Sequence, residues 1–219
     1  MPGAELARRE RAGPHPLAVV LRDAADRRFP PADGEVEVVP PYLDGVEAMV
    51  SLTGHAVAAT RVPARVLREA GADGFAGATS AAVLATLAGR GGEVDVLDAL
   101  LVARGTGRTG LPERRDLADH PRVRYAQAWR SDVHVHGDER GLVTVARGIG
   151  GLPELSFEVV PGRRGWGIGR ALLADALGLV PEGEPVLAAV APGNAASLRA
   201  VLAAGFVPVG SVQLLRPGR

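Results

Sequence analysis

The chain has no cysteine among its 219 residues, and all 25 of its basic residues are arginine. The missing cysteine excludes a disulfide framework, a thiolate nucleophile and a cysteine-based zinc site, and it fits a reducing compartment. The missing lysine excludes a Schiff-base mechanism and the lysine of a P-loop. Asparagine occurs only once, at Asn194, which therefore requires an explanation.

Net charge is also missing, because 25 basic residues balance 25 acidic ones. Nothing therefore draws the whole molecule to nucleic acid or to an anionic membrane, and we expect neither as a partner. The early apolar run "PLAVVL" is too short to span a bilayer, and the acids Glu5, Glu10, Asp23 and Asp26 argue against a transit peptide. We expect a cytoplasmic protein.

The hydrophobic pattern divides the chain into successive regions of an α/β protein. Residues 1–35 are predicted to form an arm with one helix, and residues 36–110 an N-terminal α/β region. A polar connection rich in glycine and proline then precedes a core predicted over residues 120–219. Whether the second region folds as a separate domain or adds its strands to the sheet of the core stays open.

The order of elements predicts a mixed sheet with helices on its faces. In the N-terminal region, "EVEVV", "VEAMVSL", "HAVAATRV" and "DALLVARG" are typical of strands, and helices are expected near 63–70 and 78–89. In the core, the expected strands are "RVRYAQAWRSDVHVH", "LVTVARG", "ELSFEVV", "PVLAAVAP" and "FVPVGSVQLL", and the expected helices are "GIGRALLADALGLV" and "NAASLRAVLAAG".

The stretch "GRRGWGIGRALL", residues 162–173, places several glycines between a strand and a helix. Backbone N–H groups at a helix start bind anions, and glycine allows a ligand to approach the backbone closely. The Walker pattern fails without a lysine, and the spacing Gly165-x-Gly167-x-Gly169 fits the dinucleotide fingerprint poorly. A tight strand-to-helix connection without any ligand is the alternative.

A third phosphate-binding template fits position by position: a strand ending in Val-x-Pro, then Arg or Gln, two residues, Gly, one residue, and Gly or Ala. Here these positions are Val159, Pro161, Arg164, Gly167 and Gly169. This pattern resembles the acyl-CoA motif of the GNAT superfamily of N-acetyltransferases. The downstream segment "VAPGNAASLRAVLAAGFVPVG" resembles the second signature of that family, at Asn194, Ser197, Gly205 and Phe206. The resemblance covers roughly residues 120–219 and implies a GNAT-like acyl-CoA-binding fold. Asn194 and Gly205 also suit the N-cap and the C-terminal end of a helix.

The resemblance implies acetyl-CoA as the acetyl-donor cosubstrate. Its pantetheine arm would lie between "ELSFEVV" and "PVLAAVAP", its pyrophosphate would meet the glycine-rich amides, and an N–H near Val159 or Val160 would bind the oxyanion. Trp166 either covers the coenzyme or shields the loop. The implied coenzyme-binding residues are Val159, Val160, Arg164, Gly165, Trp166, Gly167, Ile168, Gly169, Arg170, Asn194 and Ser197.

The expected catalytic residues lie on the strand "ELSFEVV". Glu154 and Glu158 share one strand face, and glutamates on this strand serve as the base in some members of the family that the chain resembles. Alternatively, the two glutamates are surface acids without a catalytic role. Asp132 is the reserve candidate for the base. Many family members protonate the leaving thiolate with a tyrosine where this chain has Val201, so coenzyme binding is better supported than turnover.

These observations predict transfer of an acetyl group from acetyl-CoA to a primary amine, by direct attack in a ternary complex. The acceptor is expected to be a small-molecule or peptide amine, and a homodimer is compatible with the fold. The alternative is a catalytically degenerate GNAT-like domain that binds acyl-CoA as a regulatory or scaffolding module. His134 and His136 have no third ligand at a matching spacing, so we expect no metal.

Overall fold

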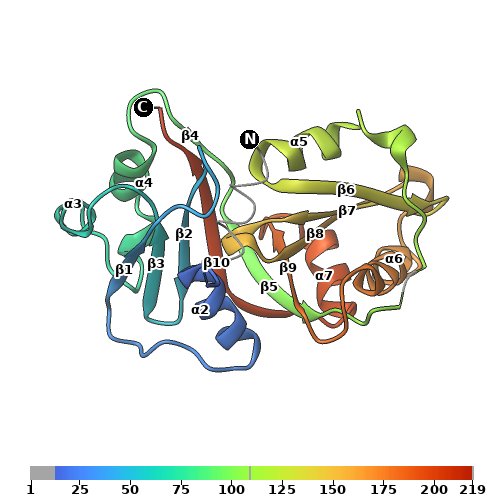
Figure 1. Ribbon diagram of the computed structural model, residues 1–219, viewed down its shortest axis with the longest axis horizontal. Coiled ribbons are helices and arrows are strands. Elements are labelled where there is room, and N and C mark those ends of the chain that lie inside the picture. The colour runs from blue at the N-terminus through green and yellow to red at the C-terminus, as the bar shows by residue number, and fades with distance from the viewer. Residues whose placement is uncertain (1–12, 109, 219) are drawn as a thin grey trace.

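A ten-stranded mixed sheet runs through the computed structural model, which describes residues 13–108 and 110–218. The strand order is β1-β3-β2-β10-β5-β9-β8-β7-β6, and β4 pairs with β10 beside this path (Figure 1). The strands are β1 (Val36–Val39), β2 (Glu47–Leu52), β3 (His55–Ala59), β4 (Glu93–Val94), β5 (Asp98–Arg104), β6 (Ser131–Asp138), β7 (Gly141–Arg147), β8 (Pro153–Val159), β9 (Pro185–Val190) and β10 (Val207–Arg216). The predicted mixed α/β fold is confirmed.

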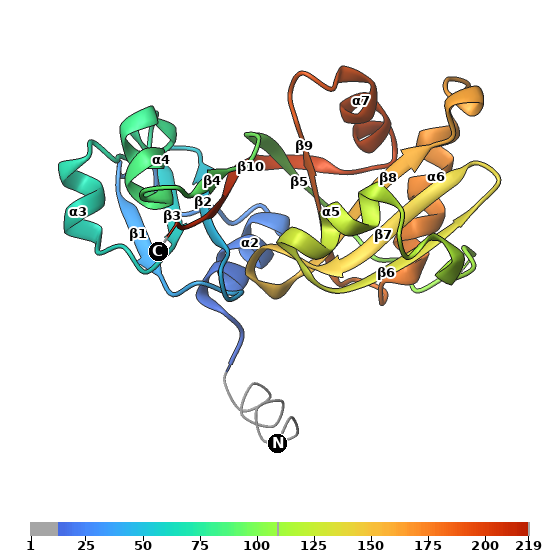
Figure 2. The ribbon, with the colours of Figure 1, turned by 90° about the horizontal axis from the view of Figure 1, so that it is seen from above.

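Helices cover both faces of this sheet (Figures 1 and 2). On one face, Leu17 of α2 and Trp129 at the end of α5 join the cluster that contains Val102. On the other face, Leu172 of α6 packs in the cluster of Leu101, the next residue along β5, because strand side chains alternate between faces. The helices are α2 (Pro16–Ala25), α3 (Ala64–Glu69), α4 (Ala81–Ala88), α5 (Pro121–Trp129), α6 (Ile168–Ala176) and α7 (Ala195–Ala203).

The predicted strand "RVRYAQAWRSDVHVH" is wrong in its first half. Residues Pro121–Trp129 form α5, and only Ser131–Asp138 form a strand. The alternation of Val123 and Tyr125 with arginines imitates a strand, but the buried residues are Val123, Ala126 and Trp129, which recur at helical spacing. Pro121 at the first helical turn and the ring of the preceding His120, which accepts from the N–H of Arg122 at 3.2 Å, begin the helix.

The two predicted regions share the sheet. Strand β5 of the N-terminal region lies between β9 and β10, and β10 of the core pairs with β2 along Ser211–Leu215. The boundaries at 110 and 120 stay a prediction. The predicted helix of the arm is α2, which buries Leu17, Leu21 and Ala24, whereas residues 1–12 of the arm lie outside the described residues.

Among the described helices, none combines the length and the apolar character that crossing a bilayer would require.

Candidate active site

Strands β8 and β9 run parallel and separate from each other. Strand β8 pairs with β7 along its full length, from Pro153 to Val159, but it pairs with β9 at the single position Glu154↔Leu187. Beyond Glu154 the two strands therefore diverge toward their C-terminal ends, and we call this opening the splay. Strand alternation turns Phe157 and Val159 toward α6 and α7, and Ser156 and Glu158 toward α5.

The glycine-rich turn follows β8 at the open end of the splay. Three successive residues have left-handed backbone: Gly165 (φ 90°), Trp166 (φ 54°) and Gly167 (φ 77°). A β-carbon on Gly165 or Gly167 would meet no atom within 4 Å, so both backbones face open space. Trp166 is 100% exposed and therefore does not shield the loop, which removes one of its two expected roles.

Helix α6 begins without a side-chain cap, because its N-cap residue is Gly167. The first N–H groups of a helix have no intrahelical acceptor, and within the described chain no backbone or side-chain acceptor is recorded for those of Gly169 and Arg170. The remaining residues of the turn line the same connection, with Arg164 and Arg170 exposed and Ile168 half-buried. Unpaired N–H groups at a helix start form an anion site.

Gly169 has a second role, in packing. A β-carbon there would lie 3.2 Å from the β-carbon of Ala200 and 3.2 Å from Cε2 of Phe157. The glycine lets α6 approach both α7 and β8, so its identity is explained by the close approach of these elements.

The second signature forms the start of α7. The side-chain oxygen of Asn194 accepts from the N–H of Ser197 at 3.1 Å, and Gly205 has φ 95° just after the end of the helix. Both residues therefore occupy the helix-end positions that they prefer. This accounts for the single asparagine of the chain, while contacts of Asn194 and Ser197 with a coenzyme stay a prediction.

Glu154 lies at the closed end of the splay, and its carboxylate has hydrogen-bond partners within the protein. It is 1% exposed, pairs with the guanidinium of Arg130 and accepts from the N–H of Ile149 at 3.3 Å. A β-carbon on Gly148 would lie 1.9 Å from its Oε2, so the chain is built closely around it. The geometry gives Glu154 the position of a structural ion pair, and its expected role as a base stays a prediction.

Glu158 borders a groove of about 370 Å³ between the segment before α5, the turn from β6 to β7 with Asp138 and Glu139, and the end of β8. Its carboxylate pairs with Nε of Arg122 at 3.1 Å. The N–H of Val160, a candidate oxyanion donor, donates to the carbonyl of Arg140 at 3.0 Å, which leaves the N–H of Val159 as the better candidate. The groove is also lined by Arg114, Leu117, His120, Leu142 and Pro161.

Asp98 lies on β5, the strand on the other side of β9 from the splay, and nothing in the sequence analysis singled it out. It begins β5, and the next residue, Ala99, pairs with Val190 at the end of β9. Burial raises the pKa of Asp98 to about 6, helped by the charges of Asp95 and Glu154, while Arg130 lowers it. The only local signal was an acid directly before the apolar run "ALLVA".

The remaining predicted residues lie away from the splay or carry no polar group. Val201 is 1% exposed in the core, so α7 presents no acid there. His134 contacts Asp132 at 3.0 Å, and His136 lies 3.2 Å from the carbonyl of Leu111. Within residues 13–108 and 110–218, no group of three or more His, Cys, Asp or Glu could hold a metal ion.

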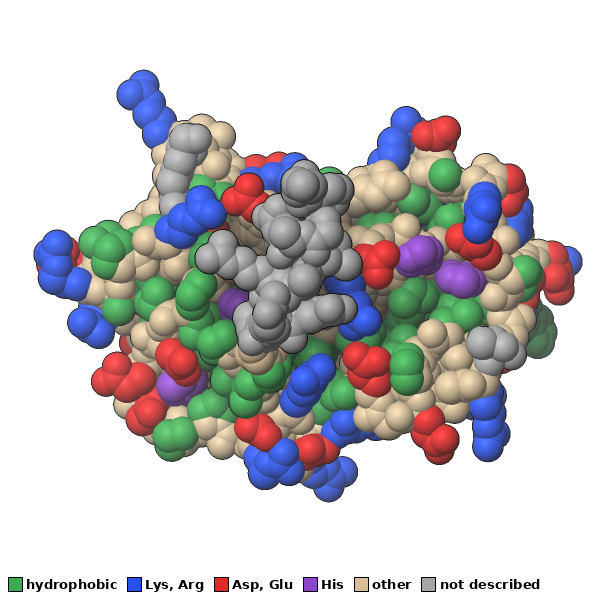
Figure 3. Space-filling model, viewed as in Figure 1, with side chains coloured by type: hydrophobic (Ala, Val, Ile, Leu, Met, Phe, Trp, Pro, Cys, Tyr) green, Lys and Arg blue, Asp and Glu red, His purple; other side chains and the backbone are tan. Residues whose placement is uncertain are grey.

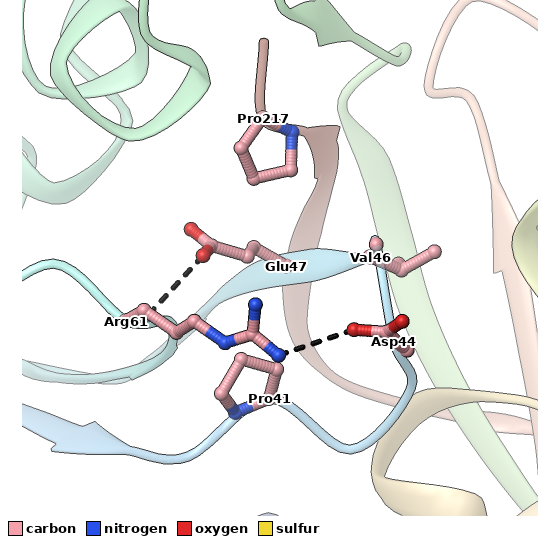
Figure 4. Close-up of a pocket in the computed structure, with 7 residues that line it drawn as sticks. Pro41, Asp44, Val46, Glu47, Arg61 and Pro217 are labelled. Atoms are coloured by element: carbon pink, nitrogen blue, oxygen red, sulfur yellow. Dashed lines mark hydrogen bonds and ion pairs between the residues drawn. The ribbon is translucent and has the colours of Figure 1, made fainter. Parts of the chain in front are cut away.

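A smaller pocket of about 170 Å³ lies at the other end of the sheet (Figure 4). Its buried acid, Glu47, accepts from the hydroxyl of Thr60 and from the N–H of Arg61 at 3.1 Å, and Arg61 pairs with Asp44 at 3.1 Å. Strand β2, which carries Glu47, is separated from β8 by β10, β5 and β9. This pocket is therefore no part of the splay.

No protein-family model and no curated protein matches the chain. Among solved structures, it is similar to an acetyltransferase of the GNAT family from Colwellia psychrerythraea (12% identity, TM-score 0.36, 57% of each chain covered). It is also similar to a putative GNAT-family acetyltransferase from Novosphingobium aromaticivorans (17% identity, TM-score 0.40, 59% of this chain and 69% of that chain). A conserved protein of unknown function from Staphylococcus epidermidis has 15% identity and a TM-score of 0.37, over 63% of this chain and 67% of that chain.

The first of these matches spans less than two thirds of its own protein's length.

Proposed function

We propose that the protein transfers an acetyl group from acetyl-CoA to a primary amine, by direct attack in a ternary complex. The observation that carries the proposal is the splay between β8 and β9, which is closed by Glu154↔Leu187 and leads to an uncapped helix start at Gly167. An open strand edge suits an amide-bearing arm such as pantetheine, and an uncapped helix start suits a pyrophosphate.

The residues of the turn fit a coenzyme phosphate. Among the described residues, the N–H groups of Gly169 and Arg170 in the first turn of α6 have no acceptor, whereas that of Ile168 donates to the carbonyl of Gly165 at 3.2 Å. The space above Gly165 and Gly167 is open. Arg164 and Arg170 would add positive charge beside these amides. When bound, acetyl-CoA would supply the activated acetyl group.

The acceptor would approach from the face covered by α5, where Glu158 and its groove lie. The chain's own contribution there is to hold the amine, to take its proton and to orient the N–H of Val159 toward developing negative charge. On the face seen in Figure 3, acidic and basic side chains are interspersed, which fits a small local acceptor site. We expect a small-molecule or peptide amine as acceptor.

A specific observation supports the alternative, a regulatory or scaffolding module that binds acyl-CoA without turnover. Val201 is buried at the position where many members of the family have a tyrosine acid. Both functions require coenzyme binding, and only the enzyme releases a thiol in the presence of an amine.

Calorimetric titration of the purified protein with acetyl-CoA, with NADH as control, tests the binding step. The tryptophans offer a second readout, because Trp166 is fully exposed beside the turn and Trp129 is 2% exposed in the core. We expect saturable binding of acetyl-CoA alone and a change in tryptophan emission that the Trp166→Phe variant loses. Absence of binding would overturn the proposed function, and binding without thiol release would favour the module.

A further inference from the structure

The carboxylates that surround the splay on the α5 face differ in their partners. Asp98 has no hydrogen bond or ion pair with any residue of the described chain, although it is half-buried. The neighbouring acids each have a donor: Glu154 has Arg130, Glu158 has Arg122, and Asp95 has the hydroxyl of Tyr125. Asp98 is therefore the acid of this group that is free to exchange a proton with a ligand.

The strand register places Asp98 on β5, level with the open end of the splay on the other side of β9. Ala99 pairs with Val190, the last residue of β9, so Asp98 lies level with the point where β9 ends. Val102 pairs with Leu187, and Leu187 with Glu154, so alternation along β5 turns Asp98 to the same face as Glu154. This is the face covered by α5.

Helix α5 brings further polar groups to this position. The hydroxyl of its Tyr125 donates to Asp95, which precedes β5, and its C-cap residue Arg130 donates to Glu154. Arg130 is 8% exposed, and its Nε and Nη1 have no hydrogen-bond partner within the described residues. The buried hydroxyl of Tyr42 likewise has none there. Buried polar groups without a partner call for an explanation, and we assign these to contacts with a ligand.

We propose that Asp98 is the general base that removes a proton from the acceptor ammonium, an inference that rests on the proposed function. The carboxylate of Asp98 takes one proton from the ammonium, which leaves a neutral amine and a protonated Asp98. The amine nitrogen then forms its bond to the acetyl carbon as the bond from that carbon to sulfur breaks. The thiolate of coenzyme A leaves with the electron pair of the carbon–sulfur bond. It then takes up the second proton, which the nitrogen loses when the amide forms. Asp98 returns its proton to solvent.

The charges around Asp98 give the pH dependence. Burial and the negative charges of Asp95 and Glu154 raise its pKa to about 6, while the positive charge of Arg130 opposes them. Asp98 also acts on Tyr125, whose pKa is raised by burial and by its bond to Asp95. A base with a pKa near 6 is ionised at neutral pH and still basic enough to accept a proton. The rate should therefore rise as pH increases through about 6.

The test compares the wild type with Asp98→Asn, with acetyl-CoA as donor and with spermidine and a short glycine-starting peptide as amine probes. We expect kcat to fall by at least about 100-fold, because general bases contribute factors of this order. The dissociation constant of acetyl-CoA should not change, and the rise of the rate near pH 6 should disappear. Asp98→Glu should restore part of the rate, and Asp95→Asn should move the rise to lower pH.

Thermal unfolding provides a readout that needs no turnover. An acid with a raised pKa in the folded state makes the fold less stable as pH rises from about 4 to about 6. Asp98→Asn should therefore unfold at a higher temperature than the wild type at pH 7.5, and at the same temperature at pH 4. If Asp98→Asn and the wild type unfold at the same temperature at pH 7.5 as well as at pH 4, Asp98 does not have the raised pKa that we assign to it.

The outcomes separate the two proposals. If the wild type binds acetyl-CoA and acetylates a probe, and Asp98→Asn keeps its rate and its pH profile, Asp98 is not the base. A matched loss in Glu158→Gln alone would move the role to Glu158. If the wild type fails to bind acetyl-CoA, or binds it and acetylates neither probe, the proposed enzyme function fails and the base role fails with it.

Discussion

The helices that follow β8 and β9 begin in opposite ways. Helix α7 starts at Asn194, whose side chain accepts from the N–H of Ser197 at 3.1 Å. Helix α6 starts at Gly167, in left-handed backbone and without any side-chain cap. A cap is worth about 1 kcal/mol, so the start of α6 lacks a stabilisation that the start of α7 has. The difference teaches that two helices of one sheet can start with very different pairing of their first N–H groups, and our proposal assigns the unpaired ones to a coenzyme phosphate.

The largest expected effect separates the two helix starts by charge. Gly167→Asp should weaken acetyl-CoA binding by at least about 100-fold, because a carboxylate beside the phosphates costs several kcal/mol. Asn194→Asp adds the same charge at the start of α7, where it still caps the helix, and should weaken the affinity much less than Gly167→Asp. Calorimetric titration of both variants with acetyl-CoA measures the two affinities. Equal losses would show that the coenzyme uses both helix starts, and no loss in folded Gly167→Asp would remove the phosphates from α6.

A substitution of Gly169 tests the packing that holds α6 in place. Gly169→Val puts a side chain against Ala200 and Phe157, which lie 3.2 Å from the β-carbon position, and should cost about 1–3 kcal/mol of unfolding free energy. Because the strain is relieved by shifting α6, acetyl-CoA affinity should fall as well. Gly162→Ala is the matched control, since its β-carbon would meet no atom within 4 Å. Urea unfolding measures both, and an unaffected Gly169→Val would contradict the close approach.

Removing the cap of α7 should affect stability alone. Asn194→Ala should cost about 1 kcal/mol, because the N–H of Ser197 loses its acceptor. If Asn194 acts only as a cap, the dissociation constant of acetyl-CoA stays that of the wild type. A weaker affinity in a folded Asn194→Ala protein would instead support the predicted coenzyme contact of Asn194 and Ser197. Thermal unfolding and calorimetry on the same sample distinguish these results.

The smallest effect concerns Trp166, which has φ 54° and full exposure. Left-handed backbone costs a residue with a side chain about 1–2 kcal/mol, a cost that glycine does not have. Glycine in turn destabilises the fold by about 0.5–1 kcal/mol, because its unfolded chain has more conformational entropy to lose. Trp166→Gly should therefore stabilise the fold by about 0.5 kcal/mol. It should also weaken acetyl-CoA binding if the ring covers the coenzyme. Destabilisation would mean that the ring makes contacts within the protein.

Local patterns predicted much of the fold and part of the site. The glycine-rich turn and the ends of α7 depend on residues close in sequence, so their spacing was sufficient. Helix α5 was predicted as a strand because Val123 and Tyr125 alternate with arginines, and burial against the sheet decided otherwise. The alternation of residue types in this segment is compatible with a strand, and only the packing against the sheet shows that the buried residues recur at helical spacing.

The sequence could not show which of the acids near the splay has a carboxylate without an ion-pair partner. Glu154 and Glu158 share a strand face, as predicted, but Arg130 and Arg122 reach them from α5, which was not expected as a helix. Asp98 gains its position through the pairing of β5 with β9, which joins residues far apart in the chain. A single sequence gives residue types and local periods, whereas the charge state of an acid depends on neighbours that only the sheet order brings together.

Strand β10 has a consequence for how the protein is made. It lies between β2 and β5, yet residues 207–216 leave the ribosome long after both neighbours. Until then, those two strands each lack a partner along one edge, and unpaired edges invite association between chains. The sheet can therefore close between β2 and β5 only after residues 207–216 have been made, and the open edges of both strands are an association hazard until then.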